Sequence, residues 1–506
     1  MKTKHTLIKG TLLLTITGFV SRIIGFYYRI FLSQTIGAVG IGIYQLIFPI
    51  YAICFSFTSA GIQTAISRLV AARAYQNDHK SSHRVLQVGL FLSLILSFLT
   101  SYFVFNNAEF LSKYILMDSR CTSLLRILSV SVPLGTIHSC INGYYYGMKK
   151  AGIPALSQLV EQSARVISVY LMYKICLQNN TAISIDLAVV GLVIGEFASM
   201  LVSVTALNLT YAREPKCLTR ASSRILLLKS LITQSVPLTL NRVLLNVLQS
   251  TEAILIPSRL RLFGLDTESS LSVYGVLTGM ALPLILFPSA LTNSVSVMLL
   301  PAVAEAQAGN QNAQLSSTAQ KTIKYCIILG IFCTGLFLAL GRSMGTVLFH
   351  DDSVGSFIVT LAWICPFLYL STTLSSIVHG LGKTTSSFIC NLVSILIRIC
   401  FVFFGIPKWG INGYLWGLLI SQLLLSLLLM LVLNRSIKIH FQAVDWLVKP
   451  MASIALAIFI TKDFNILFSH FTWMNGLLQL LATAGVFTIV YACSIILTNT
   501  KQLCKQ

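Results

Sequence analysis

The chain has 506 residues, of which 55% are hydrophobic and only 10% charged, whereas a soluble domain carries roughly 25% charged residues. This composition excludes an ordinary soluble enzyme and a disordered chain, and it predicts an all-α polytopic membrane protein. The 36 Lys and Arg against 15 Asp and Glu give a formal net charge of +21, which is typical of cytoplasmic loops that contact anionic membrane lipids and does not indicate a nucleic-acid partner.

Long apolar runs follow one another along the whole chain. Because they are continuous and do not alternate, they predict helices and not a β-barrel. The first run follows a basic start and lacks a small-residue cleavage site, so we expect a transmembrane helix there and not a signal peptide. We expect about 14 transmembrane helices, over residues 7–32, 41–67, 85–105, 122–147, 153–177, 184–211, 230–257, 271–300, 322–345, 356–380, 385–405, 411–434, 446–461 and 474–498.

Basic residues gather in alternate loops. The N-terminus carries Lys2, Lys4 and Lys9, the loop 33–40 after the first segment carries no charge, and the loop after the second segment is basic again. The positive-inside rule therefore predicts that both termini are cytoplasmic. An even number of spans requires that the termini share a side, in agreement with this orientation.

Matching residues recur in the two halves of the chain. The pattern Pro-x13-Gly-x2-Lys occurs at residues 133–150 and at 366–383, an offset of 233, and Tyr44 matches Tyr274 at an offset of 230. Two six-helix copies that start on the same side are parallel, as in transporters with alternating access and a midplane site between the halves. We predict an N-terminal lobe at 1–211, a cytoplasmic linker at 212–229, a C-terminal lobe at 230–440, and two extra helices with a cytoplasmic tail at 441–506.

Two arginines lie inside the first apolar segment. Arg22 and Arg29 are seven residues apart, which is nearly two helical turns, so they share one face. A charge inside a span needs a partner or an aqueous cavity, and we interpret the pair as the cationic wall of a central cavity. The alternative, snorkelling to the membrane surface, fits Arg29 near the helix end better than Arg22.

The fifth segment carries Glu161 and Arg165, spaced i,i+4 with the acid first, which is the favoured geometry of a helical ion pair. The pair either neutralises itself or lines the cavity. Glu196 in the sixth segment stands alone and receives no predicted role. His138 and His379 are single imidazoles on small-residue helices, which favours packing or helix–helix hydrogen bonds over metal ligation.

The seventh segment is polar on one side. Arg242, Asn246 and Gln249 share a face, and Glu252 is a candidate partner for a first-segment arginine or for a coupling cation. Because arginine exceeds acid in the first and seventh segments together, the cavity suits an anionic substrate, which guanidinium groups bind bidentately. The sequence contains no catalytic grouping and no metal-ligand spacing, so we expect no enzyme, no metal and no cofactor beyond a coupling ion, Na⁺ or H⁺, or the membrane potential.

Several stretches resemble a known family. Residues 59–71 (SAGIQTAISRLVA), 154–162 (PALSQLVEQ) and 379–383 (HGLGK) are similar to the stage V sporulation protein B group of the multidrug/oligosaccharidyl-lipid/polysaccharide exporter superfamily, whose relatives include MurJ-like lipid II flippases and MATE drug exporters. The resemblance implies fourteen helices, a V-shaped pair of lobes and export of a lipid-linked sugar across the bacterial cytoplasmic membrane.

The resemblance extends unevenly to the site. Arg22 and Arg29 match the cationic first helix of MurJ-like flippases, but residues 41–66 and 271–300 lack the arginines that those relatives carry there. Residues 7–32 lack the acid by which MATE relatives couple to cations.

The resulting hypothesis is a monomeric flippase for an undecaprenyl-diphosphate-linked peptidoglycan or polysaccharide precursor. Two alternatives stay open: MATE-like cation-coupled multidrug efflux and a non-transporting scaffold for cell-wall assembly.

Overall fold

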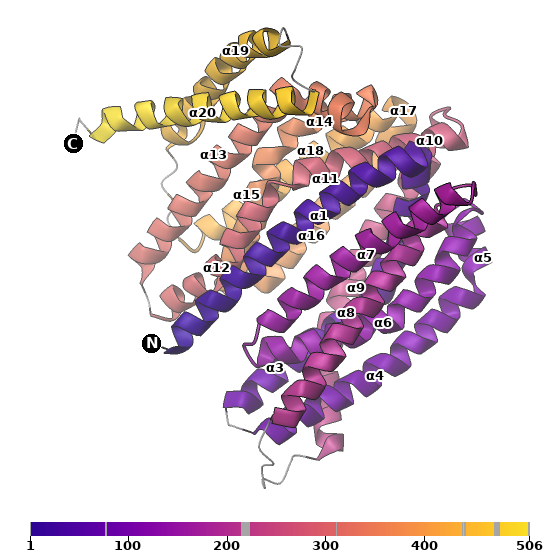
Figure 1. Ribbon diagram of the computed structural model, residues 1–506. Helices are drawn as coiled ribbons and strands as arrows, with labels where there is room; N and C mark the ends of the chain where they lie inside the picture. Colours follow the sequence, from indigo (N-terminus) through magenta and orange to yellow (C-terminus); the bar gives the residue numbers. More distant parts are fainter. Residues whose placement is uncertain are drawn as a thin grey trace. The chain divides into compact units, whose positions relative to one another are not determined.

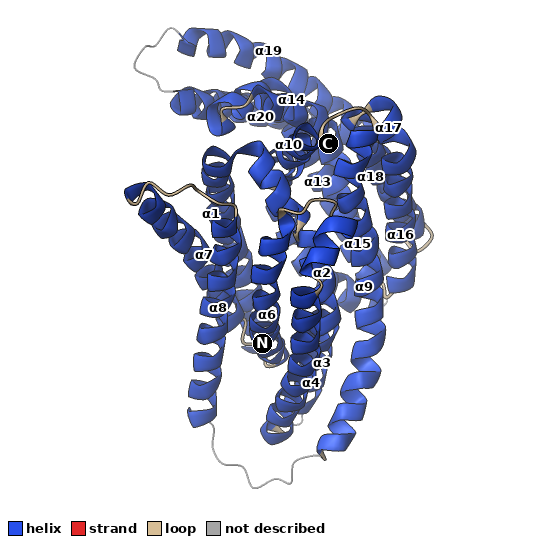
Figure 2. Cartoon of the chain, turned by 90° about the vertical axis from the view of Figure 1, so that its right-hand side faces the viewer, coloured by secondary structure: helices blue, strands red, loops and turns tan. Residues whose placement is uncertain are grey.

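The computed structural model describes residues 2–75, 78–213, 223–309, 311–437, 439, 442–469 and 476–503. Helices make up nearly all of these residues and none of them forms a strand (Figure 2), which confirms the all-α prediction. Most of the predicted linker 212–229 and both chain ends, Met1 and Gln506, lie outside the described residues.

Eleven stretches of the described residues are long and apolar enough to cross a membrane, as expected of a multi-pass membrane protein. The first, residues 13–74, joins two predicted segments, because the chain is helical from Lys2 to Leu46 except at Gly37 (φ 68°, ψ 179°). Only glycine adopts that backbone conformation readily. The predicted loop over 33–40 is therefore reduced to a break at Gly37, with helical residues on both sides of it. All fourteen predicted segments overlap described helices, but their number as separate spans stays a prediction.

The described helices form two compact units. Unit 1 lies within Met1–Ser258 and Asp266–Gly275, and unit 2 within Arg259–Leu265 and Val276–Gln506. These bounds reflect packing, whereas the predicted lobes rest on the sequence repeat, so the seventh segment falls in unit 1 here. The repeat-based domain bounds stay a prediction.

Unit 1 is a bundle in which α4, α6, α7 and α8 lie side by side (Figure 1). Buried apolar residues of α3, α4 and α6 form its main core. Its elements are α1 (Lys2–Leu46), α2 (Phe48–Phe55), π-helical η1 (Ser56–Ala60), α3 (Gly61–Tyr75), α4 (His79–Asn106), α5 (Ala108–Phe110), η2 (Leu111–Ile115), α6 (Cys121–Gly147), α7 (Gly152–Gln178), α8 (Asp186–Arg213), most of α9 (Arg224–Leu262) and α10 (Thr267–Gly275).

Unit 2 has its core where α12, α13, α15 and α18 pack together. Helices α19 and α20 pack against each other and against α13. Its elements are η3 (Val276–Ala281), α11 (Leu282–Leu286), α12 (Ser289–Ala308), α13 (Asn312–Met344), η4 (Gly345–Phe349), α14 (Asp352–Leu361), η5 (Ala362–Ile364), α15 (Cys365–Gly380), α16 (Thr384–Cys400), η6 (Phe401–Gly405), α17 (Ile406–Trp409), α18 (Ile411–Asn434), η7 (Val444–Val448), α19 (Lys449–Ser469) and α20 (Gly476–Leu503).

Contacts inside unit 1 recur inside unit 2 at an offset of 233 residues. A Cβ added to Gly147 of α6 would lie 2.8 Å from Val70, and one added to Gly380 of α15 would lie 2.9 Å from Val303. The same offset relates Ser101–Ser129 to Thr334–Ala362, Cys140–Ser93 to Thr373–Cys326, and the helix-end bond Lys150–Tyr145 to Lys383–Val378. These contacts support the repeat, and they show that the predicted offset of 230 in the second and eighth segments is out of register by three.

Helices α1 and α10, both in unit 1, cross at two glycines. A Cβ added to Gly42 would clash with the carbonyl oxygen of Leu271, and one added to Gly275 would clash with that of Ala38. The two halves of this contact are related by the same offset of 233, so the crossing is reciprocal. Glycine is required on both helices because their backbones touch.

Candidate functional site

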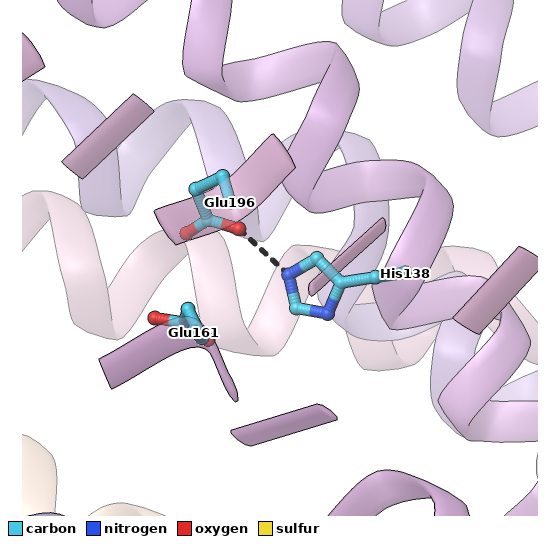
Figure 3. A group of neighbouring side chains, drawn as sticks. All are labelled: His138, Glu161 and Glu196. Atoms are coloured by element: carbon cyan, nitrogen blue, oxygen red, sulfur yellow. Dashed lines mark hydrogen bonds and ion pairs between the residues drawn. The ribbon is translucent and has the colours of Figure 1, made fainter. Parts of the chain in front are cut away.

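Glu196 on α8 is the centre of a buried polar network in unit 1. Its side chain is 7% exposed. The Tyr51 hydroxyl from α2 donates to Oε1 at 2.9 Å. His138 Nε2 from α6 lies 2.7 Å from Oε2 (Figure 3). A carboxylate in apolar surroundings is stable when its oxygens are hydrogen-bonded, and here both oxygens have partners.

Two glycines give this network its space. A Cβ added to Gly135 of α6 would lie 3.2 Å from Glu196 Oε2 and from the Tyr51 hydroxyl oxygen. A Cβ added to Gly195 of α8 would lie 2.8 Å from the carbonyl oxygen of Glu161. The small residues therefore let α6, α7 and α8 approach closely enough for their polar side chains to meet.

Glu161 and Arg165 of α7 form the predicted ion pair, with the Arg165 guanidinium 2.8 Å from Glu161 Oε1. Their side chains are 16% and 15% exposed. One ring nitrogen of His138 and one carboxylate oxygen each of Glu161 and Glu196 lie within 4.8 Å of one another, and Figure 3 shows the three side chains gathered from three helices. The predicted pair is thus one part of a larger network that joins α2, α6, α7 and α8.

The network is built as a set of protein hydrogen bonds and ion pairs. One His and two Glu side chains are ligand types that Zn²⁺ accepts. However, Tyr51 and His138 already occupy both oxygens of Glu196, and the Arg165 cation lies beside Glu161. A bound metal would have to displace these partners and to tolerate an adjacent positive charge. We therefore assign no metal to these residues.

Arg22 and Arg29 lie on α1, which packs against α7. Between them Gly25 faces α7, since a Cβ added there would lie 4.0 Å from Gln162 Oε1. Positions three before and four after Gly25 share its helix face, so both arginines lie on the α7 side of α1. Both are half-buried, and Arg29 is close enough to Arg165 for electrostatic interaction. The predicted cationic face thus lies beside the α7 ion pair, and its binding of substrate stays a prediction.

The polar face of α9 contacts the chain around α2 and α3. The Arg242 guanidinium donates to Thr64 Oγ1 at 3.4 Å, and Asn246 Nδ2 donates to Ser56 Oγ of η1. Ser250 Oγ, four residues further on, donates to the carbonyl oxygen of Pro49 at 3.0 Å. This stripe therefore contributes hydrogen bonds to a helix–helix contact inside unit 1.

The other two candidates on α9 differ in exposure. Gln249 is exposed, whereas Glu252 is 5% exposed. The assignment of the α9 residues to a substrate cavity stays a prediction.

Glu196 is the residue that the sequence analysis missed. Its partners lie 58 and 145 positions away, and no spacing rule links residues so far apart. The sequence did contain one indication: burying a lone acid in an apolar span is costly, so Glu196 needs a partner. His138 forms a helix–helix hydrogen bond, as predicted, and His379 forms one with Ser387 at 3.3 Å.

Comparisons with known proteins give a consistent result. A family described as "Polysaccharide biosynthesis protein" matches residues 7–307. Stage V sporulation protein B of Bacillus subtilis (strain 168) is 27% identical over 456 residues, which cover 88% of this chain and 88% of that protein.

Solved structures with the same fold include the lipid II flippase MurJ in an inward closed conformation, with a TM-score of 0.73 at 16% identity over 97% of this chain and 100% of that chain. A multidrug resistance MATE family transporter of the MOP superfamily, in an inward-facing conformation, has a TM-score of 0.61 at 16% identity over 82% of this chain and 95% of that chain. The fold is therefore the one shared by MurJ and MATE transporters.

Proposed function

We propose a transport function from one premise: the chain belongs to the polysaccharide biosynthesis protein family, as a MurJ-like and stage V sporulation protein B-like member of the multidrug/oligosaccharidyl-lipid/polysaccharide (MOP) exporter superfamily. Its relatives are flippases and exporters and not enzymes. We propose that this chain moves an undecaprenyl-diphosphate-linked cell-wall precursor across the cytoplasmic membrane of a bacterium by alternating access.

The arginine pair on α1 is the observation that carries this proposal. A diphosphate headgroup brings roughly two negative charges, and dehydrating each of them without partners costs several kcal/mol. One charge-assisted hydrogen bond returns about 1.5–3 kcal/mol, so binding requires more than one arginine. Arg22 and Arg29 on a single face of α1 meet this requirement.

A second feature suits the lipid part of such a substrate. Unit 2 contains an apolar cavity of about 700 Å³ between α13, α15, α18 and α19, with walls that include Trp363, Phe367, Leu427 and Met451. Burial of apolar chain yields about 0.8 kcal/mol per CH₂ group. A prenyl chain fits a cavity of this character, whereas a sugar or a diphosphate does not.

Multidrug efflux is the second candidate, because a MATE transporter shares the fold. The charge of the first segment argues against it. Residues 7–32 contain two arginines and no Asp or Glu, and such a surface repels the cationic compounds that a cation-coupled exporter would carry. An anionic substrate fits the sign of this helix.

Reconstitution in liposomes tests the proposal. The purified protein should translocate a fluorescent lipid II analogue, and Arg22→Ala should lower the rate at least tenfold, since about 1.4 kcal/mol of lost binding is tenfold. Arg22→Lys should retain part of the activity because it keeps the charge and loses the bidentate fork. Arg29→Ala should have a milder effect if that side chain snorkels to the membrane surface.

The matched control is Arg126→Ala, which removes an exposed arginine from α6 and should leave the rate unchanged. Full activity of Arg22→Ala at normal expression would eliminate the cationic site. Accumulation of an organic cation in place of lipid II would favour efflux, and transport of neither would favour a scaffold.

A further inference from the structure

Among the described residues, Asn142 of α6 has a buried amide oxygen to which no group donates a hydrogen bond. The residue is 9% exposed, and its Oδ1 accepts no hydrogen bond from the described part of the chain. Its Nδ2 lies 3.5 Å from Nδ1 of His138, one helical turn away. A buried carbonyl oxygen that lacks a donor is costly, so this side chain lies in an incomplete hydrogen-bond arrangement.

The missing donor is present when His138 gains a proton. In the neutral state the Asn142 amide donates to Nδ1, so Nδ1 carries no hydrogen, and Nε2–H donates to Glu196 at 2.7 Å. Rotation of the Asn142 amide by half a turn presents Oδ1 to Nδ1. That orientation is favourable when Nδ1 carries hydrogen, which makes the ring an imidazolium with two N–H donors.

The charges around His138 favour the same proton. The titratable groups that face it are Glu196 from α8, Glu161 and Arg165 from α7, and, through Glu196, Tyr51 from α2. Glu161 is paired with Arg165, near which Arg29 of α1 also lies, so Glu196 is the carboxylate whose charge an imidazolium at His138 would balance directly. A buried network is more stable without an unbalanced charge.

The α3 and α4 groups that contact α6 next to His138 are uncharged. Ser93 of α4 bonds to Cys140, and the Gln63 backbone of α3 contacts Gly143, and neither Ser93 nor Gln63 titrates. His83 of α4 stacks on Tyr144, more than one helical turn beyond His138.

The repeat shows that the arrangement is special to unit 1. At the offset of 233, Ser371 and Ser394 of unit 2 occupy the positions of His138 and Glu161. Serine does not titrate in the physiological range. The two copies therefore differ in proton chemistry, although their packing contacts match.

We propose that His138, Glu196 and Asn142 form a site that binds and releases one proton, with rotation of the Asn142 amide accompanying each change. The proton joins Nδ1 of His138 and leaves from the same atom. The site is independent of the identity of the transported substrate, and it supplies unit 1 with a position for a coupling proton.

Nitrogen NMR of the ¹⁵N-histidine-labelled protein in lipid bilayers tests the proposal without substrate. The His138 signals, identified by their loss in His138→Gln, should report one N–H at pH 9 and two at pH 5. Glu196→Gln should lower the proton affinity of His138 at least tenfold, because an adjacent opposite charge changes a pKa by about 1 to 3. Asn142→Leu should lower it less, and it preserves the ion pairs if Glu196→Gln fails to fold.

Two control variants test whether the effect is specific to the residues around His138. Glu109→Gln, an exposed carboxylate in α5, and His379→Gln on α15 should leave the His138 titration unchanged. A His138 ring that keeps one protonation state from pH 5 to pH 9 in the folded protein would overturn the proposal. So would one equivalent of a divalent metal that co-purifies with the wild type and is lost in His138→Gln.

Discussion

Replacing Arg165 alone should destabilise the protein more than replacing Arg165 and Glu161 together. The two side chains lie 2.8 Å apart and are 15% and 16% exposed, so water screens them little. In Arg165→Leu, the Glu161 carboxylate loses its cation and remains within 4.8 Å of Glu196. Removal of one partner from a buried ion pair costs about 3–5 kcal/mol. The double variant Glu161→Gln/Arg165→Leu leaves no unpaired charge at these positions, and neutral replacement of both partners costs little.

The assay is the temperature at which half of the detergent-solubilised protein is lost from the monodisperse peak in size-exclusion chromatography. We expect the order wild type, double variant, Arg165→Leu from highest to lowest midpoint. Glu109 and Lys113 form the same i,i+4 pair in exposed form, with side chains 62% and 52% exposed, so Lys113→Leu should leave the midpoint unchanged. Equal midpoints for Arg165→Leu and the double variant would refute the reasoning.

Three further outcomes follow from the helix arrangement. Single cysteines in place of the exposed Gln34 and of Asp351, in a cysteine-free background, should react with an impermeant thiol reagent from outside the cell, and labelling only after lysis would reverse the predicted orientation. Lys150 and Lys383 end matching helices, so trypsin should reach both from the cytoplasmic side of inverted vesicles; protection of one alone would contradict the parallel repeat. Gly42→Leu should lower the thermal midpoint because its side chain meets the backbone of α10, and an unchanged midpoint would contradict that crossing.

Local features of the site were predictable from the sequence. The shared face of Arg22 and Arg29 and the pairing of Glu161 with Arg165 both follow from helical periodicity, which acts over less than two turns. The repeat was visible because its clearest pattern lies at a helix end, where proline, glycine and lysine recur at fixed spacing. These predictions needed no knowledge of how the helices pack.

Contacts between helices were beyond the sequence. The bond from His138 to Glu196 depends on which faces of α6 and α8 meet, and the room for it comes from Gly135. The register of the repeat was misjudged for a related reason. Residues three apart share a helix face, so matches at 230 and at 233 fit helical periodicity equally well and only the packing contacts separate them.

The reciprocal crossing of α1 and α10 is the contact geometry of a two-fold homodimer, in which each partner offers the same patch to the other. Within a single chain, the two equivalent patches are encoded by different parts of the gene and can mutate separately. A substitution at Gly42 changes one half of the contact and leaves Gly275 intact, whereas in a dimer of half-length chains it would alter both halves at once. Fusion of two copies thus frees each one to diverge separately. His138 and Glu161 of one copy, at positions where the other copy has serines, are the kind of asymmetry that a symmetric dimer cannot hold.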